Sequence, residues 1–421
     1  MELKKYLTTI GKLAKEASYG AMCLSTKVKN LALKDMAKSL CAHNSAILKA
    51  NARDVRAALK KKLPLPLIDR LQLNAKRIRV MADSLAEIAT LDDPVGEVLK
   101  AWRRPNGLWI HKVRVPIGVI AIIYESRPNV TSDCIGLCVK SGNSVILRGG
   151  SEAMHSNLSI YASIKGALKK HRIHEGMVNM VSTCDRKALD VLLRLNEYID
   201  LVMPRGGEGL IKRVMQISRI PVIKHYKGIC AVYVDESADV KMAKEVCFNA
   251  KVQRPGVCNA METMLVHRRI AKKFLPSMLA DFRKANVEIR GCPYTRRLFK
   301  GAKAATQADY RTEFLGLILS VKVVKDVAEA TAHINTCGTH HSDSIITEDY
   351  RNALSFLRNV DSACVYVNAS TRFTDGYQFG MGAEVGISTD KLHARGPMAL
   401  EELTTYKYMV FGKGQVRTEL K

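Results

Sequence analysis

The feature that most constrains the fold is a regular alternation of β-type and helical segments from residue 119 onward. The first segment, 119-VIAIIYE-125, is a continuous run rich in β-branched residues, typical of a strand buried on both faces. Later strand-like runs alternate with segments whose apolar residues recur at a period near 3.6. This repetition predicts parallel sheets with helices on their faces. The other expected strands are 144–148, 178–182, 200–204, 229–235 and 261–267, and the expected helices are 131–142, 185–195, 207–217, 238–251 and 269–285.

The first 100 residues have a different pattern. Ala, Leu, Lys and Glu recur at helical spacing through 31–62 and 76–91, so this part is predicted to be mostly helical. After the turn signal 105-PNG-107, apolar and polar residues alternate through 109–115, which predicts a strand or hairpin arm. Residues 402–414 resemble a C-terminal strand, which we expect to pair with this arm within the chain or across a subunit interface.

The length and the cysteine pattern narrow the class of protein. A chain of 421 residues is long enough for two domains, and we expect a boundary near residue 227. No apolar run approaches the roughly 20 residues that cross a bilayer. The first 20 residues lack the apolar block of a signal peptide, which favours a cytoplasmic protein. The cysteines are odd in number and scattered, so they indicate neither a disulfide framework nor a zinc ribbon.

The formal net charge of +26 would attract anions, including nucleic acid. However, the basic residues are spread along the chain, and no RNA-binding motif or zinc finger accompanies them. We therefore interpret the charge as a solvated basic surface that favours small anionic substrates. The adjacent His340 and His341 have no carboxylate at helical ligand spacing, so no metal site is predicted.

One cysteine has the surroundings of a reactive thiol. Cys258 lies in 254-RPGVCN-259, where Pro255 and Gly256 disfavour helix and let the backbone approach a ligand closely. Arg254 supplies a positive charge four positions away and Asn259 offers a hydrogen bond. Both matter because the thiolate is the nucleophilic form of cysteine. From these residues alone, a structural thiol remains the alternative to a nucleophile.

Three glycine-rich stretches are candidate ligand loops. The turns 147-LRGGSEA-153 and 203-MPRGGEGL-210 place backbone N–H groups and an arginine where an anion could bind at a helix start. Strand-to-helix turns commonly contain glycine, and neither standard phosphate-loop motif is present. The third stretch, residues 368–389, is longer than an ordinary connection and contains aromatic residues, which predicts a functional loop.

These stretches, taken in order, resemble the gamma-glutamyl phosphate reductases of the aldehyde dehydrogenase superfamily. The resemblance covers nearly the whole chain and is most specific around Cys258 and through residues 367–397. It implies an α/β fold like that of aldehyde dehydrogenases. The motifs that carry it are 127-RPNV-130, LRGGSEA, PRGGEGL, 253-QRPGVCNAMET-263 and 367-VNASTRFTDGYQFGMGAEVGISTDKLHARGP-397.

The resemblance also implies a division of the chain. Residues 1–227 would form a Rossmann-type NADP-binding domain with an oligomerisation arm near 101–116. Residues 228–385 would form an α/β catalytic domain around the cysteine. Residues 386–421 would return to the cofactor domain and end in an oligomerisation strand, so that a small β element completes the fold.

The implied reaction is the NADPH-dependent reduction of L-glutamyl 5-phosphate to L-glutamate 5-semialdehyde and phosphate, a step of proline biosynthesis. Cys258 would form a thioester, and Asn129 would stabilise the oxyanion together with the Cys258 N–H. Hydrolytic aldehyde dehydrogenases have a glutamate base where this chain has His225. Without that base the thioester is preserved for exchange with phosphate.

The resemblance assigns the remaining site residues. Glu313 would hold the nicotinamide ribose of NADP(H), and Arg148 with Ser151 would tolerate the ribose phosphate, where NAD-preferring relatives have an acidic residue. The expected cofactor-binding residues are Arg148, Gly149, Ser151, Arg205, Gly206, Gly207 and Glu313. The expected substrate-binding residues are Arg254, His225, Arg372 and Asp375.

The expected partners are the substrate and phosphate, further copies of the chain in a homo-oligomer, and a transient contact with glutamate 5-kinase, because the acyl phosphate is labile. Neither nucleic acid nor a membrane is expected. Two alternatives stay open. One is another acylating dehydrogenase that uses coenzyme A or N-acetylglutamyl phosphate. The other is a nucleic-acid-binding protein that keeps the dehydrogenase fold, although the presence of Cys258 argues against it.

Overall fold

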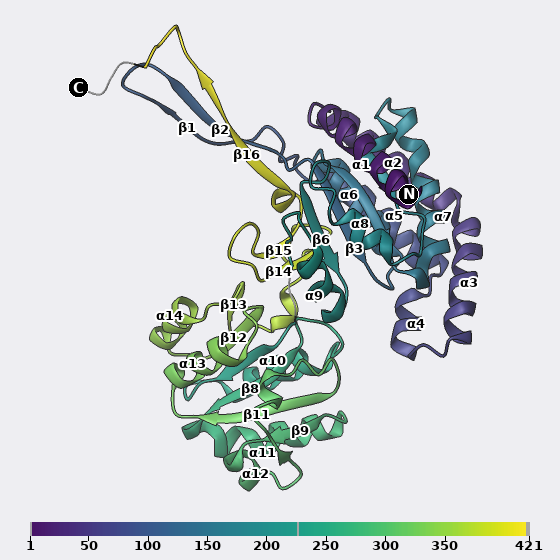
Figure 1. The fold of residues 1–421 in the computed structure, drawn as a ribbon. Helices are drawn as coiled ribbons and strands as arrows, with labels where there is room; N and C mark the ends of the chain where they lie inside the picture. The colour runs from purple at the N-terminus through teal and green to yellow at the C-terminus, as the bar shows by residue number, and fades with distance from the viewer. Residues whose placement is uncertain (1, 225–226, 418–421) are drawn as a thin grey trace. The chain divides into compact units, whose positions relative to one another are not determined.

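The computed structural model describes residues 2–224 and 227–417, and the chain divides into two compact units (Figure 1). The first unit contains the chain up to Lys224, and the second continues to Phe379. The chain re-enters the first unit at Gly380–Gly386, contributes Ile387–Pro397 to the second, and returns to the first from Met398 onward. The sequence-based division has a single return at residue 386, whereas the chain crosses between the units three times after Phe379.

The first unit is built on a four-stranded parallel sheet with the order β5-β4-β3-β6. Strand β3 is buried along its whole length, as its continuous apolar sequence predicts. Val119, Ala121 and Ile123 face the core shared with α1, while the Tyr124 hydroxyl on the opposite face hydrogen-bonds Thr131 of α6 over 2.7 Å. The strands are β3 Val119–Tyr124, β4 Ser144–Gly149, β5 Val178–Met180 and β6 Leu201–Arg205.

Helices account for most of the remainder of this unit, and the mostly helical N-terminal region is confirmed. The predicted helical stretch 31–62 is interrupted, because His43 ends one helix and precedes the next. The helices are α1 Glu2–Ala21, α2 Thr26–Ala42, α3 Asn44–Lys60, α4 Leu65–Leu71, α5 Ala75–Thr90, α6 Asn129–Lys140, α7 Met154–Lys170, α8 Lys187–Leu192 and α9 Glu208–Ile217.

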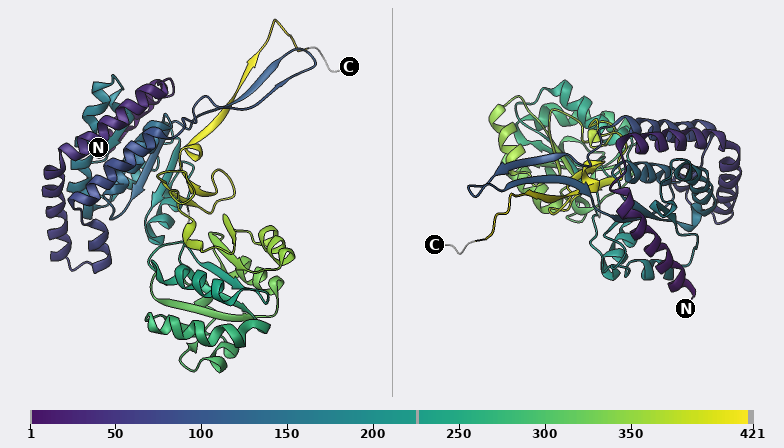
Figure 2. Two further views of the ribbon diagram at one scale, coloured as in Figure 1. Left: turned by 180° about the vertical axis from the view of Figure 1, so that it is seen from behind. Right: turned by 90° about the horizontal axis from the view of Figure 1, so that it is seen from above.

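A three-stranded antiparallel ribbon belongs to the first unit and extends away from its helices in both views of Figure 2. It consists of β1 Val98–Arg103, β2 Trp109–Pro116 and β16 Thr404–Phe411, with β2 in the centre. In the pairing of β16 with β2, Thr404 lies opposite Pro116 and Phe411 opposite Trp109. The predicted pairing of the C-terminal strand with the arm is thus confirmed, and it forms within one chain.

The second unit contains a seven-stranded, wholly parallel sheet with the order β10-β9-β11-β8-β7-β12-β13. One face is covered by α10, α11 and α12, and the other by α13 and α14. The strands are β7 Cys230–Val234, β8 Met261–His267, β9 Glu288–Gly291, β10 Lys303–Ala304, β11 Ile318–Val324, β12 Ser342–Ile346 and β13 Cys364–Val367. The helices are α10 Val240–Val252, α11 Arg268–Lys284, α12 Pro293–Leu298, α13 Val327–Cys337 and α14 Tyr350–Asn359.

Short elements lie where the chain crosses between the units. Strands β14 Gly386–Ser388 and β15 Gly396–Met398 pair as a two-stranded sheet. The predicted loop 368–389 otherwise contains a single 3-10 turn, Thr371–Phe373, before β14. Across the described residues, no helix combines the length and the apolar character that a membrane span requires.

Candidate active site

Cys258 lies in the loop that joins α10 to β8, and its side chain is partly exposed. The Cys230 thiol donates a hydrogen bond to the Cys258 carbonyl oxygen over 3.2 Å. Gly228 packs against the same carbonyl so closely that a Cβ there would lie 1.8 Å from the oxygen. Only glycine permits such an approach. The backbone that carries the Cys258 thiol is therefore held by the segment leading into β7.

Burial makes several of the buried thiols of the chain less acidic. Burial raises the pKa of Cys134 to about 12, so this group is protonated at neutral pH. Cys292, at the start of α12, differs in a way the sequence does not indicate. Burial opposes its ionisation, but hydrogen bonding with Thr295 and neighbouring backbone groups lowers its pKa below the ordinary value. Burial also raises the pKa of Cys138, Cys230 and Cys247.

Arg372 connects the 368–379 loop to the loop of Cys258. Its Nε donates to Gln253 Oε1 over 2.9 Å, and its Nη1 donates to Asn259 Oδ1. Burial, followed by the positive charge of Arg254, lowers the pKa of the Arg372 guanidinium, while the Cys258 thiol acts in the opposite direction. Two arginines predicted to bind substrate therefore lie within electrostatic reach of each other, and one of them within reach of the thiol.

Asn259 fastens the same two loops from the other side. Its side-chain Nδ2 donates to the Thr374 backbone carbonyl over 2.8 Å, and its own backbone carbonyl accepts from the Thr371 hydroxyl over 2.7 Å. Asp375 follows directly and accepts at Oδ1 from the backbone N–H of Tyr377 over 3.0 Å. Its carboxylate thus caps a turn of the loop, and its contact with a substrate ammonium stays a prediction.

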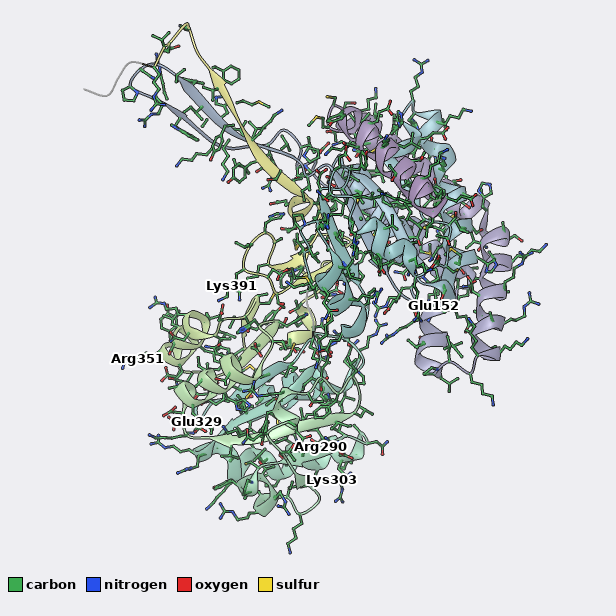
Figure 3. All side chains as sticks on the ribbon, viewed as in Figure 1. Glu152, Arg290, Lys303, Glu329, Arg351 and Lys391 are labelled. Carbon is green, nitrogen blue, oxygen red and sulfur yellow. The ribbon has the colours of Figure 1, made fainter. Side chains whose placement is uncertain are left out.

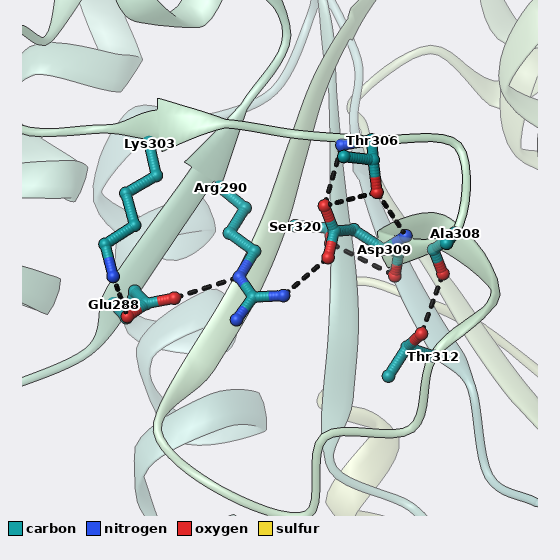
Figure 4. A network of polar contacts seen from close by, with 8 residues as sticks. All are labelled: Glu288, Arg290, Lys303, Thr306, Ala308, Asp309, Thr312 and Ser320. Atoms are coloured by element: carbon teal, nitrogen blue, oxygen red, sulfur yellow. Dashed lines mark hydrogen bonds and ion pairs between the residues drawn. The ribbon is translucent and has the colours of Figure 1, made fainter.

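The loop that carries Glu313 is fastened to the sheet by the charge network of Figure 4. Arg290 Nη1 lies 2.5 Å from Asp309 Oδ1, and the Arg290 guanidinium lies over the Phe314 ring at 4.9 Å. Glu313 Oε1 accepts from the Gly228 N–H over 2.9 Å. Because Gly228 also touches the Cys258 carbonyl, one glycine contacts two of the predicted site residues of this unit, Glu313 and Cys258. His225, assigned to the substrate, lies outside the described residues.

Asn129 belongs to the first unit, where it is the exposed first residue of α6. Its Nδ2 donates to Asp133 Oδ2 over 3.1 Å, one helical turn further on. Burial raises the pKa of Asp133 to about 6, although hydrogen bonds from Asn129 and Ser84 and the charge of Arg205 oppose the shift. The amide of Asn129 is thus oriented by a carboxyl group on its own helix.

The predicted cofactor residues of the first unit lie together at the carboxyl edge of its sheet, where open α/β sheets bind ligands. Gly149 and Arg205 flank Tyr124 on either side in the strand register. Arg148 Nε is buried and, among the residues the structure describes, has no hydrogen-bond partner. Ser151 is exposed in the turn that follows β4.

Two carboxylates occupy the same edge. Glu125 Oε2 accepts from the Gly207 N–H over 2.9 Å, and a Cβ at Gly206 would lie 2.5 Å from that oxygen. Glu152, labelled in Figure 3, accepts at Oε1 from the Ser126 N–H over 2.6 Å. A phosphate at the start of α9 would therefore compete with Glu125 for the Gly207 N–H.

Comparisons with known proteins identify the family of this chain. A sequence model of the aldehyde dehydrogenase family matches residues 12–291 and 290–409. The gamma-glutamyl phosphate reductase of Thermodesulfovibrio yellowstonii is 54% identical over 417 residues, which cover 99% of this chain and 100% of that protein. The one from Caldanaerobacter subterraneus is 55% identical over 406 residues, covering 96% and 98%. The chain belongs to the aldehyde dehydrogenase family, among its gamma-glutamyl phosphate reductases.

Solved structures support the same family. The crystal structure of gamma-glutamyl phosphate reductase from Thermotoga maritima matches with a TM-score of 0.96 and 50% identity, covering 98% of this chain and 100% of that one. A glyceraldehyde-3-phosphate dehydrogenase from Methanocaldococcus jannaschii, complexed with NADP, has a TM-score of 0.70 and 16% identity over 97% and 95% of the two chains, and so shares the fold. The aldehyde dehydrogenase-like α/β fold predicted from the sequence is confirmed.

As an aldehyde dehydrogenase family member, the chain is an oxidoreductase, and the family relationship supports a nicotinamide cofactor. The residues present fit such a group, because the carboxyl edge of the first sheet combines glycines with the unsatisfied donor of Arg148. Among the described residues, no cluster of three or more His, Cys, Asp and Glu side chains could hold a metal ion.

Sequence reasoning missed two features of this aldehyde dehydrogenase site. Gly228 was not singled out, since its importance depends on the tertiary approach of Cys258. Lys251 and Glu262 were missed as well, and they form an ion pair whose side chains are 0% and 1% exposed. A signal for this pair exists in the sequence, because Glu262 places a charge inside 261-METMLVH-267, a strand that is otherwise mostly apolar.

Proposed function

We propose that this protein reduces L-glutamyl 5-phosphate to L-glutamate 5-semialdehyde and phosphate with NADPH, the second step of proline biosynthesis from glutamate. The observation that carries the proposal is the neighbourhood of Cys258, a partly exposed thiol on a fixed backbone with Arg372 and Arg254 close by. Two guanidinium groups beside a nucleophile suit a substrate whose leaving group is a phosphate. The near-identity in length with the named reductases supports the same activity.

In the first step, the Cys258 thiolate attacks the acyl carbon of the substrate. A carbon–sulfur bond forms, the bond from that carbon to the phosphate oxygen breaks, and inorganic phosphate leaves with the electron pair. Arg254 stabilises the departing phosphate, and Arg372 binds an anionic group of the substrate. Asn129 and the Cys258 N–H donate to the oxyanion that develops on the carbonyl, and one such donor contributes about 2.7–4 kcal/mol to lowering the barrier.

In the second step, the thioester is reduced and released. The cofactor, when bound, supplies a hydride to the thioester carbon. The resulting thiohemiacetal anion on Cys258 collapses, its carbon–sulfur bond breaks, and the aldehyde departs while the thiolate is regenerated. Glu313 orients the nicotinamide ribose. His225 replaces the base that hydrolytic relatives use, so water does not compete for the thioester.

The proposed preference for NADP over NAD rests on Arg148 and Ser151 at the carboxyl edge of the first sheet, where the carboxylates of Glu125 and Glu152 are engaged by backbone N–H groups. Arg148 is the last but one residue of β4 and has an unsatisfied buried donor, and Ser151 lies exposed in the next turn. A cation and a hydroxyl favour the ribose phosphate of NADP, where a carboxylate would repel it. At this edge, next to Arg205, the cofactor would approach the protein backbone closely at three glycines, Gly149, Gly206 and Gly207.

The decisive experiment is the reverse assay with glutamate 5-semialdehyde, phosphate and NADP. We expect Cys258→Ser to lose at least about 1,000-fold in rate, because a serine hydroxyl is a far weaker nucleophile without an activating base. Cys184→Ser, at an exposed cysteine, serves as the control and should retain the wild-type rate. Full activity in Cys258→Ser would refute the mechanism.

The same assay separates the remaining alternatives. Replacing phosphate with coenzyme A, or the semialdehyde with its N-acetyl derivative, should give little product. A rate with either substitute that matches the phosphate reaction would identify a different acylating dehydrogenase. Contact with glutamate 5-kinase stays a prediction. Co-sedimentation of the two proteins would support it, and free acyl phosphate accumulating in bulk without any such contact would oppose it.

A further inference from the structure

A fully buried ion pair brackets the loop of Cys258. Lys251 Nζ lies 2.6 Å from Glu262 Oε2, and the two side chains are 0% and 1% exposed. Lys251 is in the last turn of α10 and Glu262 is the second residue of β8. The chain therefore leaves one partner of the pair, passes through Cys258, and comes back to the other.

Stability alone does not account for such a pair. Removing two charges from water is costly, and apolar residues of similar volume are often as stable in the same place. Burial is also the largest influence on both partners, since it lowers the pKa of Lys251 and raises that of Glu262 to about 7. A charged pair in this position is therefore expected to have a function besides packing in the core.

The contact made by the second carboxylate oxygen of Glu262 indicates that function. Glu262 Oε1 accepts from the backbone N–H of Leu315 over 3.1 Å. Leu315 has a φ of 53°, a left-handed conformation that leucine rarely adopts, so the hydrogen bond holds its peptide in an unfavourable geometry. Glu313 lies two residues earlier on this loop and accepts from the Gly228 N–H.

The contacts close into a ring that passes through the backbone of Cys258. Gly228 touches both the Glu313 carboxylate and the Cys258 carbonyl, on the side of β7. Glu262 joins the Leu315 backbone to Lys251 on the side of β8. The Cys258 loop and the Glu313 loop are thus connected at two separate points, and only the connection through Glu262 uses a charge that Lys251 must balance.

We propose that Glu262, held by Lys251, is a positioning residue that sets the place of Glu313 relative to Cys258, and so aligns the nicotinamide ribose with the thiol. This inference rests on the proposed roles of Cys258 and Glu313. It assigns to the pair a part in cofactor binding, although neither side chain touches the cofactor.

The test is NADPH binding followed by its fluorescence, which needs no turnover. Glu262→Gln keeps the shape of the side chain and removes its charge, and we expect it to weaken NADPH binding about 10-fold. Glu313→Gln should weaken binding by a similar factor. Because Glu262 acts through Glu313, the double variant should bind NADPH no more weakly than whichever single variant has the lower affinity. Multiplicative losses in the double variant would overturn the proposal.

Two further variants separate positioning from folding. Lys251→Met combined with Glu262→Leu replaces the pair with apolar residues, and this protein should fold yet bind NADPH as weakly as Glu262→Gln. Wild-type affinity in that variant would show a purely structural pair and refute the positioning role. Glu236→Gln is the matched control, since Glu236 forms an exposed ion pair with Arg269, and it should bind as the wild type does.

The result is distinguishable from a failure of the proposed function. In the separate reverse assay, full activity of Cys258→Ser would refute the proposed mechanism. Wild-type NADPH affinity in Glu262→Gln would refute the positioning role of Glu262 and would leave the proposed role of Cys258 untouched. The alkylation rate of Cys258 by iodoacetamide gives an independent reading, and we expect Glu262→Gln to change it at least 3-fold, whereas an unchanged rate would contradict the coupling of the two loops.

Discussion

At the scale of single residues, the proposed chemistry depends on positive charge close to one thiol. Arg372 is fixed by Gln253 and by Asn259, the residue next to Cys258, so its guanidinium cannot move freely. Arg254 lies near enough to lower the pKa of Arg372, after the larger effect of burial. Two cations that repel each other are stabilised when an anion binds between them, and this arrangement suits the proposed release of phosphate.

Arg254→Gln should therefore raise the KM for phosphate in the reverse reaction about 10- to 100-fold, the loss expected for a hydrogen-bonded charge on the ligand. Arg254→Lys should recover part of the affinity. Arg351→Gln, at an exposed arginine of α14 labelled in Figure 3, is the control for net charge. An unchanged phosphate KM in Arg254→Gln would assign the phosphate to another residue.

Gly228→Ala tests the backbone contact beneath the thiol. The added Cβ would lie 1.8 Å from the Cys258 carbonyl oxygen, so one of the two segments must shift. A displacement of about 1 Å costs roughly 100-fold in rate when it misplaces a nucleophile, and we expect that loss in kcat. Gly166→Ala, in open space on α7, should keep the activity and add about 0.5–1 kcal/mol of stability. Equal activity in both variants would contradict this account.

At the scale of elements, Asp361 fastens the segment Ile387–Pro397 to the second unit. Lys391, labelled in Figure 3, lies 2.6 Å from Asp361 Oδ2, and Arg395 lies 2.8 Å from Oδ1. Hydrogen bonding to Lys391, and then to Arg395, lowers the pKa of the Asp361 carboxyl to about 2. A segment that the chain uses to pass between the two units is thus held by a small surface charge network.

Because the pKa of Asp361 is lowered on folding, its contribution to stability is fully present above about pH 4 and is lost as the pH falls toward 2. The side chain is 36% exposed, so solvent screening limits the pairs with Lys391 and Arg395 to about 1 kcal/mol in total. Urea unfolding should show Asp361→Asn less stable than wild type at pH 7, with the difference shrinking at pH 3. Asp83→Asn, which disrupts an exposed pair with Arg79, is the control. A difference that persists unchanged at pH 3 would exclude this role.

At the scale of the whole molecule, the ribbon of β1, β2 and β16 presents aromatic side chains to solvent. Trp109, Tyr408 and Phe411 are 51%, 56% and 55% exposed, and β16 is an edge strand of its sheet. Exposed aromatic residues on an edge strand favour association with another surface. They support the expectation that the protein is a homo-oligomer.

Tyr408→Lys combined with Phe411→Lys should therefore lower the oligomer mass measured by light scattering, since two charges would have to be buried in the interface. Tyr350→Lys, at a side chain that is 75% exposed on α14, is the control and should leave the mass unchanged. A wild-type mass in the double variant would show that the ribbon is not the interface.

Local sequence patterns were sufficient to predict many of the helices and strands of this protein. The strand predicted at 261–267 has the bounds observed for β8, and the strand at 144–148 differs from β4 by one residue, because periodicity and β-branched content are properties of neighbouring residues. Apart from the C-terminal strand, the elements after residue 300, including β12 and α14, were not predicted, since their apolar runs are short and their burial depends on the rest of the sheet.

The sequence by itself determined the family, the alternating α/β architecture and the candidate thiol, since these follow from residue order and from motifs within a few positions of one another. Only the tertiary structure decided that Gly228 touches Cys258, that Glu313 meets Gly228, and that Glu262 joins Lys251 to Leu315. Most of these contacts join residues at least 30 positions apart. They arise because the parallel sheet brings the ends of separate strands to one edge, an arrangement no local pattern encodes.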